Sequence, residues 1–237
     1  MKNENPFKWR HYEKEIILLN VRWYLRYQLS YRNLEEMMQE RGLSVDHSTI
    51  YRWVQRYAPE MEKRSRKYLR QSNDSYRIDE TYIKVRGKMK YLYRAVDSRG
   101  NTIDFLLRSR RNMESAKRFF KKMLRASNSS RPRVLSVDGN PAYPPAVKAL
   151  KEKKLLNKDC ILRQNKYLNN IIEQDHRFIK KLVRAGMGFK TFHSAWRTLK
   201  GYEIMNMIRK GQVKNIGNVQ NSVSRFRFPD LSRRQRK

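Results

Sequence analysis

The order of strand-like and helix-like segments between residues 75 and 210 constrains the fold of this chain most strongly. Three strand-like runs come first, and a turn at Ser98-Arg99-Gly100-Asn101 separates the last two. Helical and strand-like segments then alternate, which is typical of an α/β fold. The strands are expected at 75–85, 89–97, 102–107, 133–137 and 160–163, and the helices at 113–126, 146–153, 169–184 and 193–210.

Three carboxylates fall on these segments in contexts that suit metal chemistry. Asp79 lies in the first strand-like run, Asp138 directly follows an apolar run and precedes Gly139, and Glu173 lies in a helical segment. The order β-β-β-α-β-α-β-α resembles the ribonuclease-H-like fold, which carries metal-binding carboxylates on its first strand, next to its fourth strand and on a late helix. We therefore expect an α/β, ribonuclease-H-like core of the kind found in retroviral integrases.

Such a set of acids suits phosphodiester chemistry. Cleavage and strand transfer favour two divalent ions about 3.5–4 Å apart, which stabilise the attacking and leaving oxygens. Magnesium is held by a few carboxylates together with substrate phosphates. We expect two Mg²⁺ ions as cofactors, with Mn²⁺ as a possible substitute.

Each acid has an alternative interpretation. Glu80 competes with Asp79, because successive strand side chains point to opposite faces and only one of the two is expected to face the site. Asp138 is otherwise an ordinary turn aspartate. The residues alone leave both alternatives open.

Glu173 shares one face of its helix with three cations, Arg177, Lys180 and Arg184, opposite an apolar face. In one interpretation Glu173 is a metal ligand and the three cations beside it contact DNA phosphates. In the other, the face is solvated and Glu173 forms ion pairs with cations four residues away.

The charge of the chain indicates its partner. There are 55 Lys and Arg residues against 22 Asp and Glu residues, a formal net charge of +33. A globular protein this basic needs a polyanion or a strongly anionic surface, and the alternative is a merely solvated surface. No apolar run is long enough to cross a membrane, so we expect no membrane partner. The single cysteine, Cys160, excludes an internal disulfide and fits a reducing, cytosolic setting.

The N-terminal segment is expected to be an all-α helix-turn-helix domain. Ser30 and Asp46 are candidate N-caps for its second and third helices, and Gly42 suits the turn between them. The third helix is expected to stop at Ala58, because Pro59 follows. Its outer face could enter a DNA groove, and the alternative is a three-helix bundle with a solvated polar face. The candidate DNA contacts here are His47, Ser48, Thr49, Tyr51, Arg52, Gln55 and Arg56.

These patterns divide the chain into four parts. We expect a helix-turn-helix domain at 1–62, a basic linker at 63–74, a catalytic domain at 75–210 and a basic, flexible tail at 211–237.

Several strings together resemble the bacterial transposases of the insertion-sequence-six family, over about Phe7 to Gln212. They are Asp79-Glu80-Thr81-Tyr82-Ile83-Lys84-Val85, Tyr91-Leu92-Tyr93-Arg94-Ala95-Val96-Asp97, Asp138-Gly139-Asn140-Pro141-Ala142-Tyr143, Lys166-Tyr167-Leu168-Asn169-Asn170 and Glu173-Gln174-Asp175-His176-Arg177.

The resemblance implies a DDE triad of Asp79, Asp138 and Glu173, and it resolves the first-strand choice toward Asp79. It places Lys180 where this class carries a DNA-contacting Lys or Arg. It also implies cutting at the terminal inverted repeats of an insertion sequence and replicative transposition through cointegrates. The sequence departs from the family pattern at Tyr76, where tryptophan is common, and at Asn206, where histidine is common.

The expected function is therefore a metal-dependent DNA transposase. Its partners would be double-stranded DNA, both element ends and target, and a second copy of the chain in a homodimer or larger assembly. A bacterial cytoplasmic protein associated with the nucleoid fits these partners. The alternatives are a catalytically inactive copy that represses transposition by binding element ends, and a ribonuclease H acting on RNA–DNA hybrids.

Overall fold

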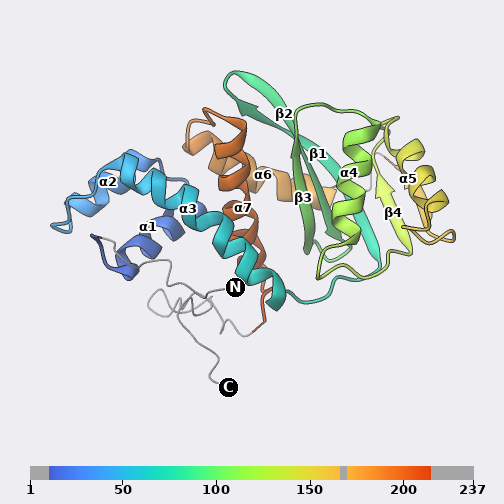
Figure 1. The fold of residues 1–237 in the computed structure, drawn as a ribbon, viewed down its shortest axis with the longest axis horizontal. Helices are drawn as coiled ribbons and strands as arrows, with labels where there is room; N and C mark the ends of the chain where they lie inside the picture. The colour runs from blue at the N-terminus through green and yellow to red at the C-terminus, as the bar shows by residue number, and fades with distance from the viewer. Residues whose placement is uncertain (1–10, 166–169, 215–237) are drawn as a thin grey trace.

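A five-stranded mixed sheet forms the centre of the computed structural model, which describes residues 11–165 and 170–214 (Figure 1). The strand order is β3-β2-β1-β4-β5, in which β1 is antiparallel to β2, and β4 is parallel to both β1 and β5. This order and the predicted β-β-β-α-β-α-β-α succession are those of a ribonuclease-H-like core, so the predicted fold class is confirmed. The strands are β1 (Ser75–Val85), β2 (Lys88–Asp97), β3 (Thr102–Arg108), β4 (Val134–Val137) and β5 (Ile161–Gln164).

Helices cover both faces of the sheet. On one face α4 (Met113–Leu124) and α5 (Tyr143–Glu152) pack together, and on the other lie α6 (Asn170–Ala185) and α7 (Phe192–Arg209) (Figure 1). Alternate residues of β1 serve the two faces, as strand geometry requires. Its even-numbered apolar residues, such as Ile78, join the α4/α5 core, and its odd-numbered ones, such as Ile83, join the α6/α7 core.

Strands β1 and β2 form a hairpin closed by only two residues. Arg86 and Gly87 have φ angles of +48° and +75°. Positive φ at both central positions is the backbone of a tight hairpin turn whose twist matches that of the strands. Strand β4 pairs with β1 only as far as Ile78, so the hairpin extends past the end of β4 (Figure 1).

Three helices precede the sheet, α1 (Lys14–Arg26), α2 (Tyr31–Gln39) and α3 (His47–Ser65). Both predicted N-caps are confirmed: the Ser30 side chain accepts the backbone N–H of Asn33, and the Asp46 side chain accepts that of Ser48. Gly42, in the turn between α2 and α3, has a φ of +72°, which glycine adopts at little cost.

The predicted end of α3 at Ala58 is wrong. The helix continues through Pro59 to Ser65. Proline removes one internal hydrogen bond, but its φ is helical. Met61 and Glu62 are buried beyond it, so packing against the rest of the molecule outweighs the local loss.

The N-terminal helices share one apolar core with α7 rather than standing apart. Gly201 of α7 lies where α7 meets α1 and α3, and a Cβ there would come within 2.5–2.8 Å of Leu25 and Ala58 side-chain atoms. Only glycine permits this close approach without movement of the neighbouring helices. The core domain and the helical domain are therefore mechanically coupled through α7.

The predicted boundaries at residues 62 and 210 both fall within continuous structure. The first part of the expected linker completes α3, and a 3₁₀ turn follows at Arg66–Tyr68. Leu69 pairs with Val213, so residues 211–214 belong to the folded body. The rest of the expected flexible tail, 215–237, lies outside the described residues, as do the motif residues 166–169. None of the helices in the described ranges is long and apolar enough to cross a membrane.

Candidate active site

Asp79 and Asp138 lie side by side because β1 and β4 are parallel neighbours. Ile78 pairs with Val137, which sets the following residues, the two aspartates, at the same level. Together with Glu80 they form a group whose carboxylate oxygens, one from each residue, all lie within 4.8 Å of one another. An all-oxygen donor set of this size suits a hard divalent cation such as magnesium.

Asp79 and Glu80 point to opposite faces of β1, as predicted. Asp79 faces α6, and Glu80 faces α5. The expectation that only one of them reaches the site is wrong, since the Glu80 carboxylate lies in the same group. Asp138 directly follows the last residue of β4.

Glu80 holds the loops around Asp138. It is buried and accepts hydrogen bonds from the Tyr143 hydroxyl, the Arg111 guanidinium and, at 3.1 Å, the Asn140 side-chain amide. Burial raises the pKa of the Glu80 carboxyl, the Tyr143 hydroxyl opposes this, and the charge of Asp138 adds to it. Sequence reasoning missed this role, because nothing in the pattern shows that donors from two loops and from the start of α5 meet at Glu80.

The two aspartates repel each other. Burial raises the pKa of Asp138, and the charge of Asp79 raises it further, against a hydrogen bond from the Asn140 backbone. Arg111 offsets part of this repulsion, with a guanidinium nitrogen 3.5 Å from Asp138 Oδ2. A divalent cation at this point would relieve the same repulsion more completely.

His176 of α6 orients Asp79. Its Nε2 lies 3.3 Å from Asp79 Oδ2, and the ring is buried. Burial lowers the pKa of His176, so the ring is neutral near pH 7. A carboxylate only accepts hydrogen bonds, so Nε2 must carry the ring proton, and Nδ1 is buried without a partner among the described residues. Asp79 Oδ1 accepts the Glu80 backbone N–H at 2.8 Å, which fixes the carboxylate at both oxygens.

Exchange of His176 for alanine is expected to lower metal affinity and activity by about 10- to 100-fold, the usual effect of losing a group that orients a ligand. His176→Gln keeps a donor of similar reach and should recover part of the loss. Titration of Mn²⁺ binding checks both variants. Equal affinity in His176→Ala and the wild type would contradict the orienting role.

Glu173, the third predicted member of the triad, lies outside the cluster formed by Asp79, Glu80 and Asp138. It is exposed in the first turn of α6, directly after the undescribed residues 166–169. It precedes His176 by three residues, a spacing that places two side chains on neighbouring positions of a helix. The helix that touches Asp79 therefore also carries Glu173.

A buried ion network holds α6 against the sheet. Arg94 is the cross-strand partner of Asp79 and is fully buried. It donates to Glu203 of α7 at 2.6 and 2.8 Å and to Asp175 of α6 at 2.7 Å. Asp175 also accepts from Lys210 at 2.6 Å. The network fixes the helix that carries Glu173 and His176 relative to the strand that carries Asp79.

Asn206, one of the two departures from the family pattern, belongs to this network. Its side-chain amide donates to Asp175 at 3.0 Å. The other departure, Tyr76, is buried and bonds through its hydroxyl to the Ser130 carbonyl oxygen at 2.5 Å. The polar side chains of both residues therefore have hydrogen-bond partners in the interior of the fold.

The basic face of α6 is exposed as the periodicity predicted. Arg177, Lys180 and Arg184 are exposed along the same side of the helix as Glu173.

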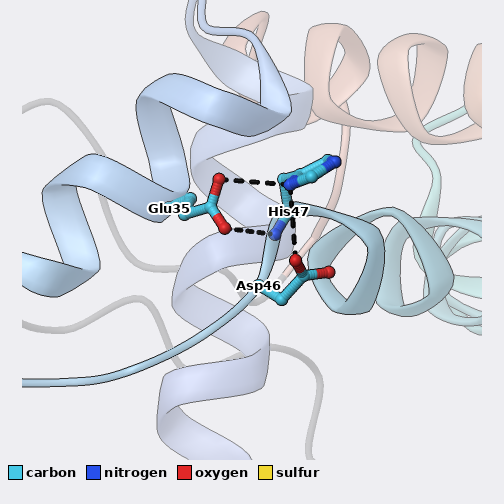
Figure 2. A group of neighbouring side chains, drawn as sticks. All are labelled: Glu35, Asp46 and His47. Atoms are coloured by element: carbon cyan, nitrogen blue, oxygen red, sulfur yellow. Dashed lines mark hydrogen bonds and ion pairs between the residues drawn. The ribbon is translucent and has the colours of Figure 1, made fainter.

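The start of α3 is held by α2. Figure 2 shows the carboxylate of Glu35, from α2, beside Asp46 and His47. Glu35 accepts the His47 backbone N–H at 3.2 Å and lies 3.1 Å from His47 Nδ1. These contacts satisfy a helix N-terminal donor and fix the angle between the two helices, so the group is a structural clamp. His47 is thereby directed toward Glu35.

The predicted outer face of α3 is exposed at Ser48, Tyr51, Arg52 and Arg56, and Thr49 is half-buried. The expectation for Gln55 is wrong. Its side chain is buried between α3 and α7 and donates to Thr198 Oγ1 at 2.9 Å. The packing of α7 against α3, which the sequence of α3 alone does not reveal, covers that position.

Substitutions at Gln55 and Arg52 distinguish the buried position of α3 from the exposed one. Gln55→Ala should lower the free energy of unfolding by about 1 kcal/mol, because it removes a buried hydrogen bond. Arg52→Ala should leave stability nearly unchanged and reduce the salt dependence of DNA binding by about one phosphate contact. Chemical denaturation and salt titrations of DNA affinity measure the two effects. The reverse pattern would contradict this placement of α3.

Comparisons with known proteins agree with this geometry. A family model described as a DDE domain matches residues 73–212. The transposase for insertion sequence-like element IS431mec of Staphylococcus aureus strain Mu50 is 41% identical over 206 residues, which cover 87% of this chain and 89% of that protein. The Staphylococcus aureus transposase for insertion sequence element IS257 in transposon Tn4003 matches with the same identity and coverage.

Solved structures with some likeness include two integrase cores. The HTLV-2 integrase catalytic core domain in complex with magnesium has a TM-score of 0.39 and 14% identity, over 48% of this chain and 71% of that one. The catalytic core domain of BIV integrase has a TM-score of 0.40 and 14% identity, over 58% and 97%.

The strand order, the paired aspartates and the matched domain define a DDE-type polynucleotidyl transferase, a class that uses divalent metal ions. Within that class, the chain belongs to the insertion-sequence-six family of transposases. It is thus an insertion-sequence transposase, and the resemblance seen in its sequence motifs is confirmed.

Proposed function

We propose that this transposase binds the terminal inverted repeats of its insertion sequence, exposes a 3′-hydroxyl at each end and joins it to target DNA by replicative, cointegrate-forming transposition. The observation that carries the proposal is the juxtaposition of Asp79 and Asp138 on neighbouring parallel strands, beside a helix that carries Glu173 and a row of cations. A basic chain that gathers carboxylates beside a row of cations is what metal-dependent chemistry on a polyanion needs.

Asp79, Asp138 and Glu173 form the proposed catalytic triad and metal-binding set. Asp79 and Asp138 already lie close enough to share a cation, and Glu173 would complete the set from α6. The donor atoms are all oxygen, which fits two Mg²⁺ ions, with Mn²⁺ able to substitute. When bound, such ions activate water or a 3′-hydroxyl and stabilise charge on the phosphate.

The remaining proposed residues hold DNA. Arg177, Lys180 and Arg184 would bind backbone phosphates along α6. The exposed face of α3 would enter a groove at the element end, with His47, Ser48, Thr49, Tyr51, Arg52 and Arg56 at the interface. Two element ends must be held together for joining, so the active form is proposed to be a homodimer or a larger assembly that works on DNA in the bacterial cytoplasm, at the nucleoid.

A binding and cleavage experiment tests this function. Duplexes made from the element's own ends and duplexes of scrambled sequence are compared at several salt concentrations, and each is then exposed to Mg²⁺. We expect tighter binding and cleavage of the true ends, with affinity falling steeply as salt rises. End binding without cleavage in Mg²⁺ or Mn²⁺ would instead identify a repressor, and degradation of RNA–DNA hybrids without any need for element ends would identify a ribonuclease H.

A further inference from the structure

A strip of aromatic and basic side chains, exposed on β1 and half-buried on β2 and β3, begins beside the acidic group. It consists of Tyr82, Lys84, Tyr91 and Arg108 and is called here the hairpin strip. Tyr82 and Lys84 follow Glu80 at two-residue steps along β1, so they lie on the same face of the sheet. Tyr82 pairs across the hairpin with Tyr91, and Tyr91 pairs with Arg108 on β3.

The part of the strip on β1 is open to solvent, including the aromatic ring of Tyr82. Tyr82 is 49% exposed, and its ring lies 5.4 Å from that of Tyr91 at a tilt of 55°. Met89, the cross-strand partner of Lys84, is 58% exposed. Tyr91 packs at the edge of the α4/α5 core and Arg108 donates to Ser115 of α4 at 3.4 Å, whereas the hairpin tip beyond them extends past both helices (Figure 1).

The charge on the hairpin has one sign. Residues 81–93 contain four Lys or Arg residues and no Asp or Glu. Glu80, the nearest acid on this face, is already engaged by three donors. The strip therefore offers cations and ring faces to an anionic partner, and residues 81–93 add no carboxylate that would repel it.

The strip and the acidic group are near neighbours. Two residues of β1 span about 6.6 Å, roughly twice the spacing of successive phosphates along a DNA strand axis. Glu80, the member of the acidic group on this face, precedes Tyr82 on β1 by those two residues. A nucleotide chain with one phosphate at the aspartates would have its next nucleotides over the strip.

We infer that the hairpin strip binds the nucleotides next to the scissile phosphate, with Tyr82 stacking on an unpaired base and Lys84 and Arg108 holding backbone phosphates. Within a duplex, base faces are covered by their neighbours. The last base at a cut end, or a base that has left its pair, offers a free face for an aromatic ring, and such stacking tolerates any base. This inference rests on the proposed function, because it places DNA at the aspartates.

A fluorescence experiment tests the strip directly. The probe is a pre-cut duplex of the element's own end with the fluorescent adenine analogue 2-aminopurine at the first unpaired position beyond the cut, without target DNA. Stacking on Tyr82 should quench its emission in the wild type and in Tyr82→Phe. Tyr82→Ala should not quench the probe, and its affinity for the duplex should be about tenfold lower. Tyr27→Ala, which removes another exposed tyrosine far along the chain, is the matched control and should behave as the wild type.

The outcomes separate this inference from the function on which it rests. Equal quenching in the wild type and Tyr82→Ala contradicts the proposed role of the hairpin strip, even if the wild type joins DNA. An unquenched wild type overturns it too, as does a change in DNA-free self-association in Tyr82→Ala with quenching intact, which would make the strip a protein interface. Quenching that depends on Tyr82, in a protein that fails to join DNA, supports the strip and refutes the transposition chemistry.

Discussion

Asp79→Asn is expected to abolish metal-dependent cleavage and joining while the protein stays folded. Asparagine keeps the shape of the side chain, and its oxygen can still accept the Glu80 backbone N–H. Its NH2 group can donate to His176 Nε2 if the imidazole ring adopts its other tautomer. It lacks the charge that binds a divalent cation. The loss of several kcal/mol of transition-state stabilisation corresponds to a rate reduction of roughly 10³-fold or more.

The same substitution should not weaken the fold. Asp79 raises the pKa of Asp138 by repulsion, so its neutralisation removes an unfavourable interaction. The melting temperature should therefore be equal or higher, and end binding without metal should be retained. Asp159→Asn, at an exposed turn acid, is the matched control with full activity. Activity retained in Asp79→Asn would contradict the assignment of this residue.

Arg94→Met is expected to destabilise the protein by about 3–5 kcal/mol, the typical cost of leaving buried charges without their partner. Arg94 is fully buried between Asp175 and Glu203. Its removal leaves Lys210 as the cation that contacts Asp175. Arg118→Met, which breaks an exposed pair with Glu114, should change stability by less than about 0.5 kcal/mol.

The pH dependence of the Arg94 variant provides a second readout. Burial alone would raise the pKa of Asp175, but Arg94 and Lys210 hold it well below its usual range. Such a group stabilises the wild type above its unfolded pKa of about 3.9, and this stability is lost as pH falls through the lower, folded pKa. Without Arg94 the pKa of Asp175 should rise, so the variant should lose less stability than the wild type as the pH falls below about 4. Parallel stability curves from denaturant titrations would contradict the network.

Local patterns sufficed to predict the elements of the core. Strand runs such as 75–85 and the apolar face of α6 are dictated by side-chain alternation and helical period, and the caps at Ser30 and Asp46 act within a few residues of themselves. The same patterns placed Asp79 and Asp138 on adjacent elements, because a β-β-β-α-β order brings the first and fourth strands together.

The errors have a common cause in long-range packing. Pro59 lies within a helix and Gln55 is buried because α7 packs on α3, far away in the sequence. Glu80 is held in the acidic group by Tyr143 at the start of α5 and by Arg111 from the loop that precedes α4. Contacts of this kind leave no periodic signal in the segment that receives them.

A strand-transfer assay tests most directly the proposal that Asp79, Asp138 and Glu173 form the active site. Pre-cut element-end DNA and a supercoiled target are incubated in Mg²⁺ with the wild type, Asp138→Ala or Glu173→Ala. We expect joined product from the wild type only, with end binding intact in all three proteins. Equal product from the wild type and Asp138→Ala would contradict the assignment of the acidic group as the active site.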